Sequence, residues 1–211
     1  MEHTRLTLFT ADPARTGDLA RFVRRDVVRC LDDELGHLGL EVLVDDELSL
    51  ETFWVSGDAM RFSEHIEAPL RKEAQYQGAA TASVERFALP IFARDRRPEP
   101  GAWSRLTRFE VERRPEDSER SYSQRVEEAV EVFEDAAMPW LETAPGFLCA
   151  SLLVHARQGR GLTKSVWEDE SALAASRSAD ATARADAAAG ADIAVRALHE
   201  LRVLFSSLRP S

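Results

Sequence analysis

Four side chains have the chemistry and the sequence setting of candidate catalytic groups: His199, His155, His65 and Arg108. His199 has an alanine two residues before it and a leucine two residues after it, and His155 ends the apolar run Leu152-Leu-Val154. Because an unperturbed imidazole titrates near neutral pH, a histidine that faces a pocket could act as a general base. A histidine among apolar residues is also often a structural group, and the sequence leaves both roles open.

His65 and Arg108 each allow two interpretations as well. His65 borders the apolar stripe of a predicted helix, so it either faces a pocket or lies at a half-exposed boundary. Arg108 points to the opposite strand face from Thr107. There it could hold an oxyanion or an enolate. It could also form a salt bridge to Glu110, Glu200 or another carboxylate.

Three aromatic residues, Trp54, Trp167 and Tyr122, are candidates for binding a ring-shaped ligand. Each tryptophan ends a predicted strand beside a predicted helix, where it could wall a pocket between sheet and helices. Tyr122 begins a long predicted helix and could cover the mouth of such a pocket. Alternatively, the tryptophans are packing positions of the fold and Tyr122 is an exposed aromatic.

Charge and motif content exclude several classes of function. The net charge is −10, whereas a nucleic-acid binder usually needs a basic face, so we expect no nucleic-acid partner. Cys30 and Cys149 lie in apolar periodic segments and are expected to be reduced core thiols. The sequence has no metal-ligand spacing, no Gly-rich phosphate loop and no GxSxG turn, so we expect no metal and no cofactor.

Length and hydropathy indicate a globular protein. Apolar residues make up 44% of the 211 residues, which is enough for a substantial core. That length suits one large domain or two of about 100 residues each. No apolar run is as long as a membrane span, and the first five residues lack a signal-peptide core. We therefore expect a cytoplasmic protein with no membrane partner.

Apolar periodicity predicts the elements of the first half. Asp18 is the expected N-cap of a first helix, and Gly36 and Gly39 should end it. Asp58 is the expected cap of a second helix that Pro69 should kink or shorten. The first apolar stripe is Leu19, Phe22, Val23, Val27, Cys30, Leu31 and Leu35, and the second is Ala59, Phe62, Ile66 and Leu70. The predicted strands span residues 5–9, 40–45, 50–55 and 84–92.

The same order of elements returns in the second half. The predicted strands span residues 103–111, 146–154, 162–167 and 195–205. A long helix is expected from Glu119 to about Ala144, with Pro139 breaking in near its end. An Ala-rich helix, capped by Asp169 or Ser171, is expected to run to about Ala189, where Gly190 stops it.

Three matches indicate an internal repeat. Arg5-Leu-Thr-Leu-Phe9 returns as Arg105-Leu-Thr-Arg-Phe109. Gly39 is matched with Gly146, and Trp54 with Trp167. Two prolines and a glycine among charges mark a linker between the repeats. The predicted organisation is a first repeat at 1–93, a linker at 94–101 and a second repeat at 102–211.

Each repeat has the order β-α-β-β-α-β, which is typical of a ferredoxin-like unit with both helices on one face of the sheet. Several strands are apolar on both faces, so the face without helices must also be buried. The sequence therefore predicts an α+β fold in which two tandem ferredoxin-like repeats pack sheet to sheet. The product would be a pseudo-dimer within one chain, similar to a dimeric α+β barrel, and two chains could associate further.

These motifs resemble the antibiotic biosynthesis monooxygenase family of the dimeric α+β barrel superfamily. The motifs that carry the resemblance are the two Arg-Leu-Thr-x-Phe strands, Pro145-Gly-Phe147, Trp54 to Met60 and Trp167 to Ser176. The resemblance implies a monooxygenase without metal or flavin, in which the carbanion of a phenolic or anthrone-like substrate supplies an electron to oxygen. The protein would bind the ring in an apolar pocket and hold the anion. The family also contains haem-degrading enzymes.

The sequence departs from the family at the functional amide. The monooxygenase members tend to use an Asn near the tryptophan of the third strand, but this chain contains no Asn. The matching positions, four residues before each tryptophan, hold Leu50 and Thr163. The haem-degrading members also need a Trp in the second helix, followed by a His. Here the Trp position is Phe62 or Ala175, and no His follows at that spacing.

Three functions therefore stay open. The first is a cofactor-independent monooxygenase, or a related cyclase-like catalyst, that acts on a small aromatic or polyketide-like molecule. The second, motivated by the missing Asn, is a non-catalytic ligand-binding or scaffold protein. The third is haem binding without degradation, through His155 or His199. Because the second repeat keeps more of the family's pattern, we expect the site there.

Overall fold

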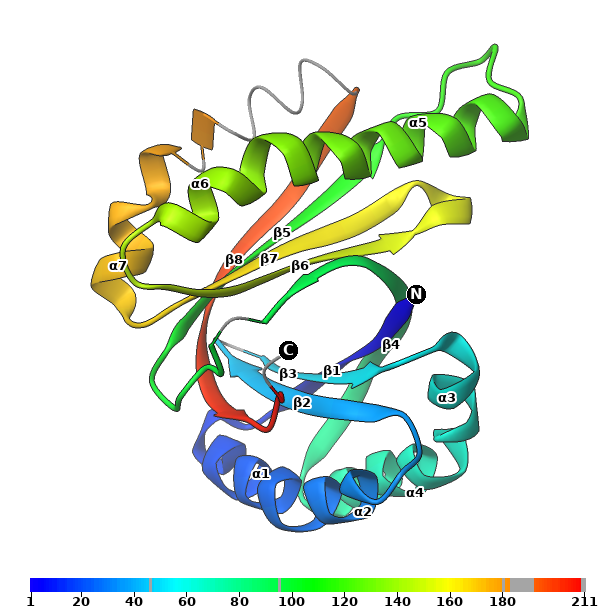
Figure 1. Cartoon of the computed structure of the whole chain (residues 1–211). Coiled ribbons are helices and arrows are strands. Elements are labelled where there is room, and N and C mark those ends of the chain that lie inside the picture. Colours follow the sequence, from blue (N-terminus) through cyan, green and yellow to red (C-terminus); the bar gives the residue numbers. More distant parts are fainter. Residues whose placement is uncertain (46, 95, 180, 183–191, 210–211) are drawn as a thin grey trace.

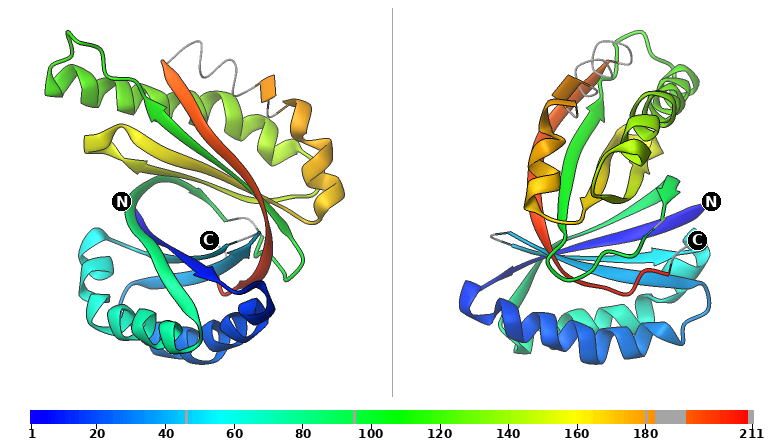
Figure 2. Two further views of the ribbon diagram at one scale, coloured as in Figure 1. Left: turned by 180° about the vertical axis from the view of Figure 1, so that it is seen from behind. Right: turned by 60° about the vertical axis from the view of Figure 1, so that its left-hand side comes forward.

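The computed structural model describes residues 1–45, 47–94, 96–179, 181–182 and 192–209. In this part of the chain eight antiparallel strands close into one barrel. Helices from the first half cover one side of the barrel, and helices from the second half cover the opposite side (Figure 1). Two further views show the same arrangement (Figure 2). The α+β class expected from the sequence is confirmed.

The elements follow the predicted order in both halves. The first half contains β1 (Glu2–Ala11), η1 (Pro13–Arg15), α1 (Thr16–Phe22), η2 (Val23–Val27), α2 (Val28–Asp32), β2 (His37–Val44), β3 (Leu48–Trp54), α3 (Gly57–Phe62), α4 (Glu64–Tyr76) and β4 (Ala79–Ala93). The second half contains β5 (Trp103–Val111), α5 (Glu119–Val132), η3 (Phe133–Ala137), α6 (Met138–Thr143), β6 (Phe147–His155), η4 (Ala156–Gln158), β7 (Arg160–Trp167), α7 (Glu170–Ala175) and β8 (Ile193–Ser206).

The strand order around the barrel is β1-β3-β2-β8-β5-β7-β6-β4, after which β4 pairs with β1. Each half therefore contributes four neighbouring strands in the same order: β4-β1-β3-β2 and β8-β5-β7-β6. The last strand of each half is its longest and pairs with a strand of the other half. Strand β4 pairs with β6, and β8 pairs with β2. These two seams leave no unpaired sheet edge in the barrel.

Alternation along the strands separates two kinds of core. One set of side chains points into the barrel and forms an interior cluster that includes Leu6, Phe53, Leu106 and Val203. The alternate set points outward and packs under the helices, as Trp54 does in the first half and Trp167 in the second. Burial of both sheet faces explains why so many strand positions are apolar on both parities.

Arg5 and Arg105 anchor matching helices in the two halves. In β1, Arg5 donates through Nη1 to Ser63 Oγ (3.1 Å) and through Nη2 to the Met60 carbonyl (2.5 Å). In β5, Arg105 donates to Ser176 Oγ (2.9 Å) and to the Leu173 carbonyl (3.0 Å). Both guanidinium groups are buried, so each satisfies carbonyl and hydroxyl groups at the end of a short helix.

The turn before the second strand corrects one predicted match. Gly36 and Gly146 both have positive φ angles, 84° and 78°. The Gly36 carbonyl accepts from the Val55 amide (2.9 Å) and the Gly146 carbonyl from the Glu168 amide (2.8 Å). The prediction that matched Gly39 with Gly146 is therefore wrong, and Gly36 is the structural counterpart. A Cβ on Gly146 would lie 2.5 Å from that of Ala172, so this turn requires glycine.

Helix starts agree with the sequence only in part. Asp169 is the N-cap of α7 and accepts from the Ala172 amide (2.8 Å), which confirms one of the two predicted caps. The cap predicted at Asp58 is wrong, because Ser56 caps α3. The cap predicted at Asp18 is also wrong: α1 begins at Thr16, and Asp18 lies in its first turn. There Asp18 forms an ion pair with Arg21.

Several residues assigned to the core are exposed. Helix α2 ends at Asp32, so Leu35 falls in the turn that follows and is 93% exposed. Phe62, at the end of α3, is 78% exposed, and Cys30 is exposed although Cys149 is buried as predicted. The second helix is broken at Ser63, while Pro69 lies inside α4.

The predicted Ala-rich helix is partly outside the described residues. Helix α7 covers Glu170–Ala175. The predicted end at Ala189 and the stop at Gly190 fall on residues that the structure does not describe. None of the described helices has the length and apolar character that crossing a membrane would require.

Candidate functional site

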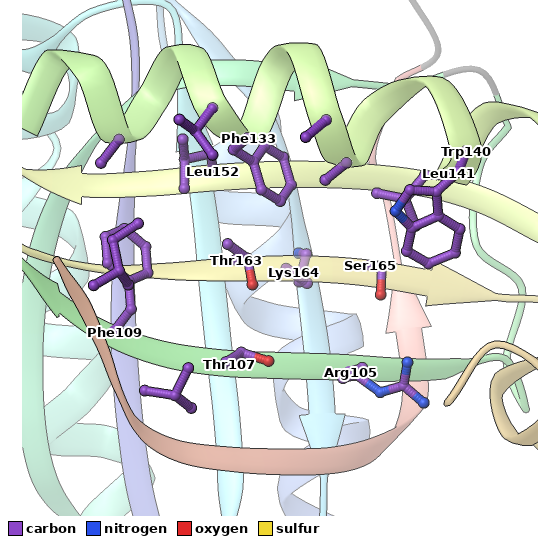
Figure 3. A pocket seen from close by; sticks show the side chains of 16 residues that line it. Arg105, Thr107, Phe109, Phe133, Trp140, Leu141, Leu152, Thr163, Lys164 and Ser165 are labelled. Atoms are coloured by element: carbon purple, nitrogen blue, oxygen red, sulfur yellow. The ribbon is translucent and has the colours of Figure 1, made fainter. Parts of the chain in front are cut away.

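A cavity with a mostly apolar wall lies in the second half, between the sheet and the helical layer formed by α5, η3 and α6 (Figure 3). Its volume is about 80 Å³. The residues that line it from the helices are Ala129, Val132, Phe133, Ala136, Ala137, Trp140 and Leu141, and those from the strands are Arg105, Thr107, Phe109, Leu152, Thr163, Lys164, Ser165, Ile193 and Val195. The wall is therefore mostly apolar, with polar groups gathered on the sheet.

The polar groups form a row on the sheet floor. Thr107 on β5 pairs directly with Thr163 on β7. Two residues along the same strands, Arg105 pairs with Ser165. Figure 3 shows these four side chains below the helix. The Ser165 hydroxyl also accepts from Trp167 Nε1 (3.0 Å). The cavity therefore offers hydroxyl groups, which both donate and accept hydrogen bonds, beneath an apolar roof.

Arg105 places a positive charge at one end of the cavity. Its Nη2 also lies 3.1 Å from Glu200 Oε1, and Glu200 in turn bonds Arg177. Burial lowers the pKa of Arg105, and the hydrogen bond to Glu200 opposes that shift. An arginine stays protonated under such conditions, so this end of the cavity has a fixed cation.

Trp140 has an unused hydrogen-bond donor at the same end of the cavity as Arg105 (Figure 3). The indole ring stacks on Trp167, with ring centroids 6.2 Å apart and an angle of 23° between the planes. Its Nε1 is buried and has no hydrogen-bond partner among the described residues. A buried donor without a partner is costly, so a ligand oxygen that accepted this bond would be favoured.

The equivalent space in the first half is nearly filled. That cavity measures about 10 Å³, which holds about one water molecule. Both cavities lie under a π-helical turn, η2 in the first half and η3 in the second. Four matched positions are larger in the first half: Leu19 and Ala129, Phe22 and Val132, Val27 and Ala137, and Leu50 and Thr163. At one further matched position the second half has the larger side chain, because Phe133 corresponds to Val23. The smaller side chains at the four positions contribute to the larger second cavity.

The predicted catalytic histidines lie away from this cavity. His199 pairs with Leu106, whose side chain is in the barrel interior, and its half-exposed ring has Nδ1 3.7 Å from Asp45 Oδ2. His155 ends β6, where it pairs with Arg160. His65 is exposed at the start of α4, with Nδ1 2.5 Å from the Phe62 carbonyl.

Arg108 lies on the barrel side of β5, opposite to the face that Thr107 presents to the cavity. It forms an ion pair with Glu85 of β4 (3.1 Å), so the salt-bridge alternative is realised with a carboxylate other than Glu110 or Glu200. Both side chains are about 30% exposed or less. The structure therefore brings Arg108 close to the first half rather than to the cavity.

The three predicted aromatic residues are all buried, and each forms a hydrogen bond to a nearby part of its own half. Trp54 Nε1 donates to Thr52 Oγ1 (3.1 Å), as Trp167 Nε1 does to Ser165. Tyr122 is 5% exposed, so the alternative that it is an exposed aromatic is wrong. Its hydroxyl lies 3.1 Å from the Val111 carbonyl, and burial raises its pKa.

None of the seven predicted site residues lines the cavity in the described part of the chain, although Trp167 backs Trp140 directly. From the sequence, Thr163 was considered only as the position of a missing amide, and Trp140 was not among the predicted site residues. A comparison of side-chain size between the matched halves was the signal that could have found the cavity. No group of three or more potential metal ligands occurs among the described residues.

No protein-family model matches the chain. The chain is 27% identical over 158 residues to the uncharacterized protein Rv2557 of Mycobacterium tuberculosis, which covers 74% of this chain and 66% of that protein. It is 29% identical over 179 residues to the uncharacterized protein Rv2558 of the same organism, covering 83% and 72%. The aligned part thus spans just under two thirds of the length of Rv2557.

Solved structures share the fold over nearly the whole chain. A Fusobacterium nucleatum protein provisionally named a monooxygenase has a TM-score of 0.71 at 15% identity, covering 99% of this chain and 95% of that one. An anthrone oxidase-like protein has a TM-score of 0.62 at 18% identity, covering 98% and 93%. A heme-degrading enzyme of Listeria monocytogenes has a TM-score of 0.52 at 7% identity, covering 94% and 98%. At these identities the similarity shows the fold.

Proposed function

We propose that the cavity of the second half binds a small aromatic molecule that carries an ionisable hydroxyl, and that the protein promotes oxidation of this molecule by O2 without metal or flavin. The observation that carries the proposal is the buried, unpartnered Trp140 Nε1 in an apolar cavity with a hydroxyl floor. Aromatic walls select a flat ring, and the indole donor selects an oxygen on that ring. The names of two proteins with the same fold, a monooxygenase and an anthrone oxidase-like protein, agree with this chemistry.

The proposal includes the organisation of the chain. We take residues 1–93 and 102–211 as tandem ferredoxin-like repeats that together form one pseudo-dimer, with 94–101 as the linker. The matching bonds of Arg5 and Arg105, and the identical strand order of the halves, support this division. In this arrangement the first half completes the barrel and the second half holds the ligand.

The charges of the cavity suit an anionic aromatic. A phenol that binds with its oxygen near Trp140 Nε1 lies at the end where Arg105 is buried. The guanidinium favours the phenolate over the neutral phenol, and the apolar roof weakens competition from water. An electron-rich phenolate can pass an electron to O2, and recombination of the two radicals forms the new carbon–oxygen bond.

The reaction balances without an external reductant. A phenol such as 1-naphthol plus one O2 gives the corresponding quinone plus one water, so one oxygen atom enters the ring and the other leaves as water. The small cavity volume, about 80 Å³, favours compact molecules over the three rings of an anthrone. We therefore name compact hydroxyaromatic molecules as the substrate class.

A second candidate is ligand binding without turnover. Apart from Arg105 and Lys164, the described residues that line the cavity have no titratable side chain, and the Lys164 ammonium is bound inside the barrel. The position of the family amide is Thr163, which can donate a hydrogen bond but is no general base. The cavity therefore has the groups that binding a ligand requires, but it has no general base for catalysis among the described residues.

The test uses 1-naphthol and anthrone as probes, with binding followed by calorimetry and turnover by an oxygen electrode. The closing variant A129L/A137V/T163L transfers three first-half residues into the second half. The matched control, L19A/V27A/L50T, makes the reverse changes in the first half. We expect wild type and the control to bind and oxidise 1-naphthol, and the closing variant to do neither.

The outcomes separate the two candidates. Binding that the closing variant abolishes, without oxygen uptake by wild type, supports the non-catalytic protein. Failure of wild type to bind either probe contradicts both. Equal binding by wild type and by a folded closing variant would place the ligand outside this cavity.

A further inference from the structure

A buried cluster of three charges connects the two halves inside the barrel. Lys164 of β7 reaches across the interior and donates to Glu41 Oε2 of β2 (2.6 Å) and to Glu51 Oε2 of β3. The three side chains are at most 1% exposed. The ammonium also lies 4.8 Å from the centre of the Phe53 ring. Both carboxylates thus belong to the first half, and the only cation that bonds them in the described residues comes from the second.

Glu51 and Lys164 occupy the same place in their own halves. Each lies three residues before the buried tryptophan that ends its strand. Glu51 pairs with Leu6 on the neighbouring strand β1, and Lys164 pairs with Leu106 on β5. One structural position therefore holds opposite charges in the two halves.

Three pairings of halves are conceivable, and they differ in buried charge. A first half with a second half places two carboxylates around one ammonium, as observed. Two first halves would place four carboxylates in one interior, because each supplies Glu41 and Glu51, and no ammonium. Two second halves would place two Lys164 ammonium groups together, with Ser151 at the position that pairs with each lysine. Burying charges without a partner strongly disfavours the last two.

We propose that Glu41, Glu51 and Lys164 form a charge code that makes the first half pair with a second half and rejects the pairing of like halves. The apolar remainder of the interior cannot supply this selection, because leucine, valine and phenylalanine from either half pack against one another without regard to sign. A single buried polar contact can decide which partners associate even where it adds little stability. The inference uses the matching of the halves and does not depend on the ligand cavity.

The Glu85–Arg108 ion pair provides a matched control within the same chain. It also joins the two halves, since Glu85 lies on β4 and Arg108 on β5. Its side chains are 26% and 30% exposed, so water screens the pair. Exchange of its charges should therefore have little effect, whereas exchange in the interior cluster should show strong coupling.

The first experiment is a charge exchange in the full chain, read as thermal midpoints. We expect E51K and K164E each to lower Tm by about 10 °C or more, since each leaves buried charge uncompensated. We expect E51K/K164E, which restores one lysine and two glutamates, to recover at least half of that loss. The E85R, R108E and E85R/R108E proteins should all stay within about 3 °C of wild type. An interior double variant no more stable than its worse single variant would overturn the proposal.

The second experiment replaces all three charged side chains of the interior cluster by apolar ones, so that no unpaired charge remains. The variant E41L/E51L/K164M should fold with a Tm near that of wild type, because apolar side chains of similar size often replace buried ion clusters without loss. After refolding at high concentration, light scattering on a sizing column should show species larger than those of wild type, formed by pairing of like halves. A variant that refolds to the same single species as wild type would show that the cluster selects no partner.

Discussion

Leu50 and Thr163 occupy matching positions, four residues before Trp54 and Trp167, and each lines the cavity of its own half. The leucine helps to fill the first cavity to about 10 Å³, and the threonine lies on the polar floor of one of about 80 Å³. The two halves thus share one strand order, while the second half has smaller side chains at several cavity positions. The smaller side chains leave open the space in which we propose that a ligand binds.

Replacing Trp140 by phenylalanine keeps an aromatic wall and removes the unpartnered donor. We expect W140F to bind 1-naphthol about tenfold more weakly than wild type, which corresponds to the loss of one hydrogen bond. Calorimetric titration measures this difference. The control is W103F, because Trp103 does not line the cavity. Equal affinities of W140F and wild type would show that the indole nitrogen does not contact the ligand.

Arg5 and Arg105 make matching bonds, but their removal should have unequal effects. Arg5 contacts the Glu67 carboxylate, which is 5% exposed, whereas the partner of Arg105, Glu200, is 21% exposed. We expect R5M to reduce the free energy of unfolding by roughly 3–5 kcal/mol, because it leaves the buried Glu67 carboxylate with Arg71, 3.7 Å away, as its cation. R105M should cost roughly 2 kcal/mol through lost hydrogen bonds to the helix end. Urea denaturation of both variants measures the difference, and a larger loss in R105M would contradict the assignment.

His37 should make the protein sensitive to acid. Its ring is buried against Trp54, and burial lowers its pKa to about 4, although Asp32, 3.9 Å from Nδ1, opposes the shift. In the unfolded chain His37 binds a proton near pH 6.5, whereas in the folded chain it stays neutral down to about pH 4. The free energy of unfolding therefore falls as the pH drops from 6.5 towards 4. At pH 5 the loss relative to pH 7 is roughly 2 kcal/mol.

The variant H37F tests this prediction, because Phe147 occupies the matching position in the second half: His37 pairs with Trp54 as Phe147 pairs with Trp167. We expect its thermal midpoint to fall less than that of wild type between pH 7 and pH 5. The reciprocal variant F147H should lose more stability than wild type over the same range. Parallel pH profiles for wild type and H37F would exclude His37 as the source.

Glu51 should have the opposite pH dependence. Burial raises its pKa, Lys164 opposes that shift, and Glu41 adds to it. A carboxyl group with a raised pKa in the folded state stabilises the protein below its unfolded pKa, and this stability is lost as the pH rises through the folded pKa. We expect E51Q to remove that loss, so that the stability of the variant relative to wild type increases between pH 5 and pH 8. The comparison is made from urea midpoints, with E85Q, at a half-buried position, as the control. A constant difference between E51Q and wild type would contradict the raised pKa.

Local patterns in the sequence determined the elements of this protein and their order. Spacings of two and of three to four residues follow directly from strand and helix geometry, so the strands and the long second-half helix could be assigned from the chain alone. The repeated Arg-Leu-Thr-x-Phe motif also identified the two positions, Arg5 and Arg105, that turned out to anchor matching helices. Helix ends were less accurate, because Ser56 and Asp58 are both good caps and only the backbone geometry selects one.

Tertiary structure alone decided how the halves join and where the cavity lies. Which group neutralises Lys164 depends on strands more than 100 residues away in the chain, and no local spacing encodes such a contact. An empty volume is likewise a sum over side chains from several helices and strands, so a change such as leucine to alanine becomes a cavity only when its neighbours do not move in. The sequence therefore determined the elements and their order, and long-range packing determined which space between sheet and helices stayed open.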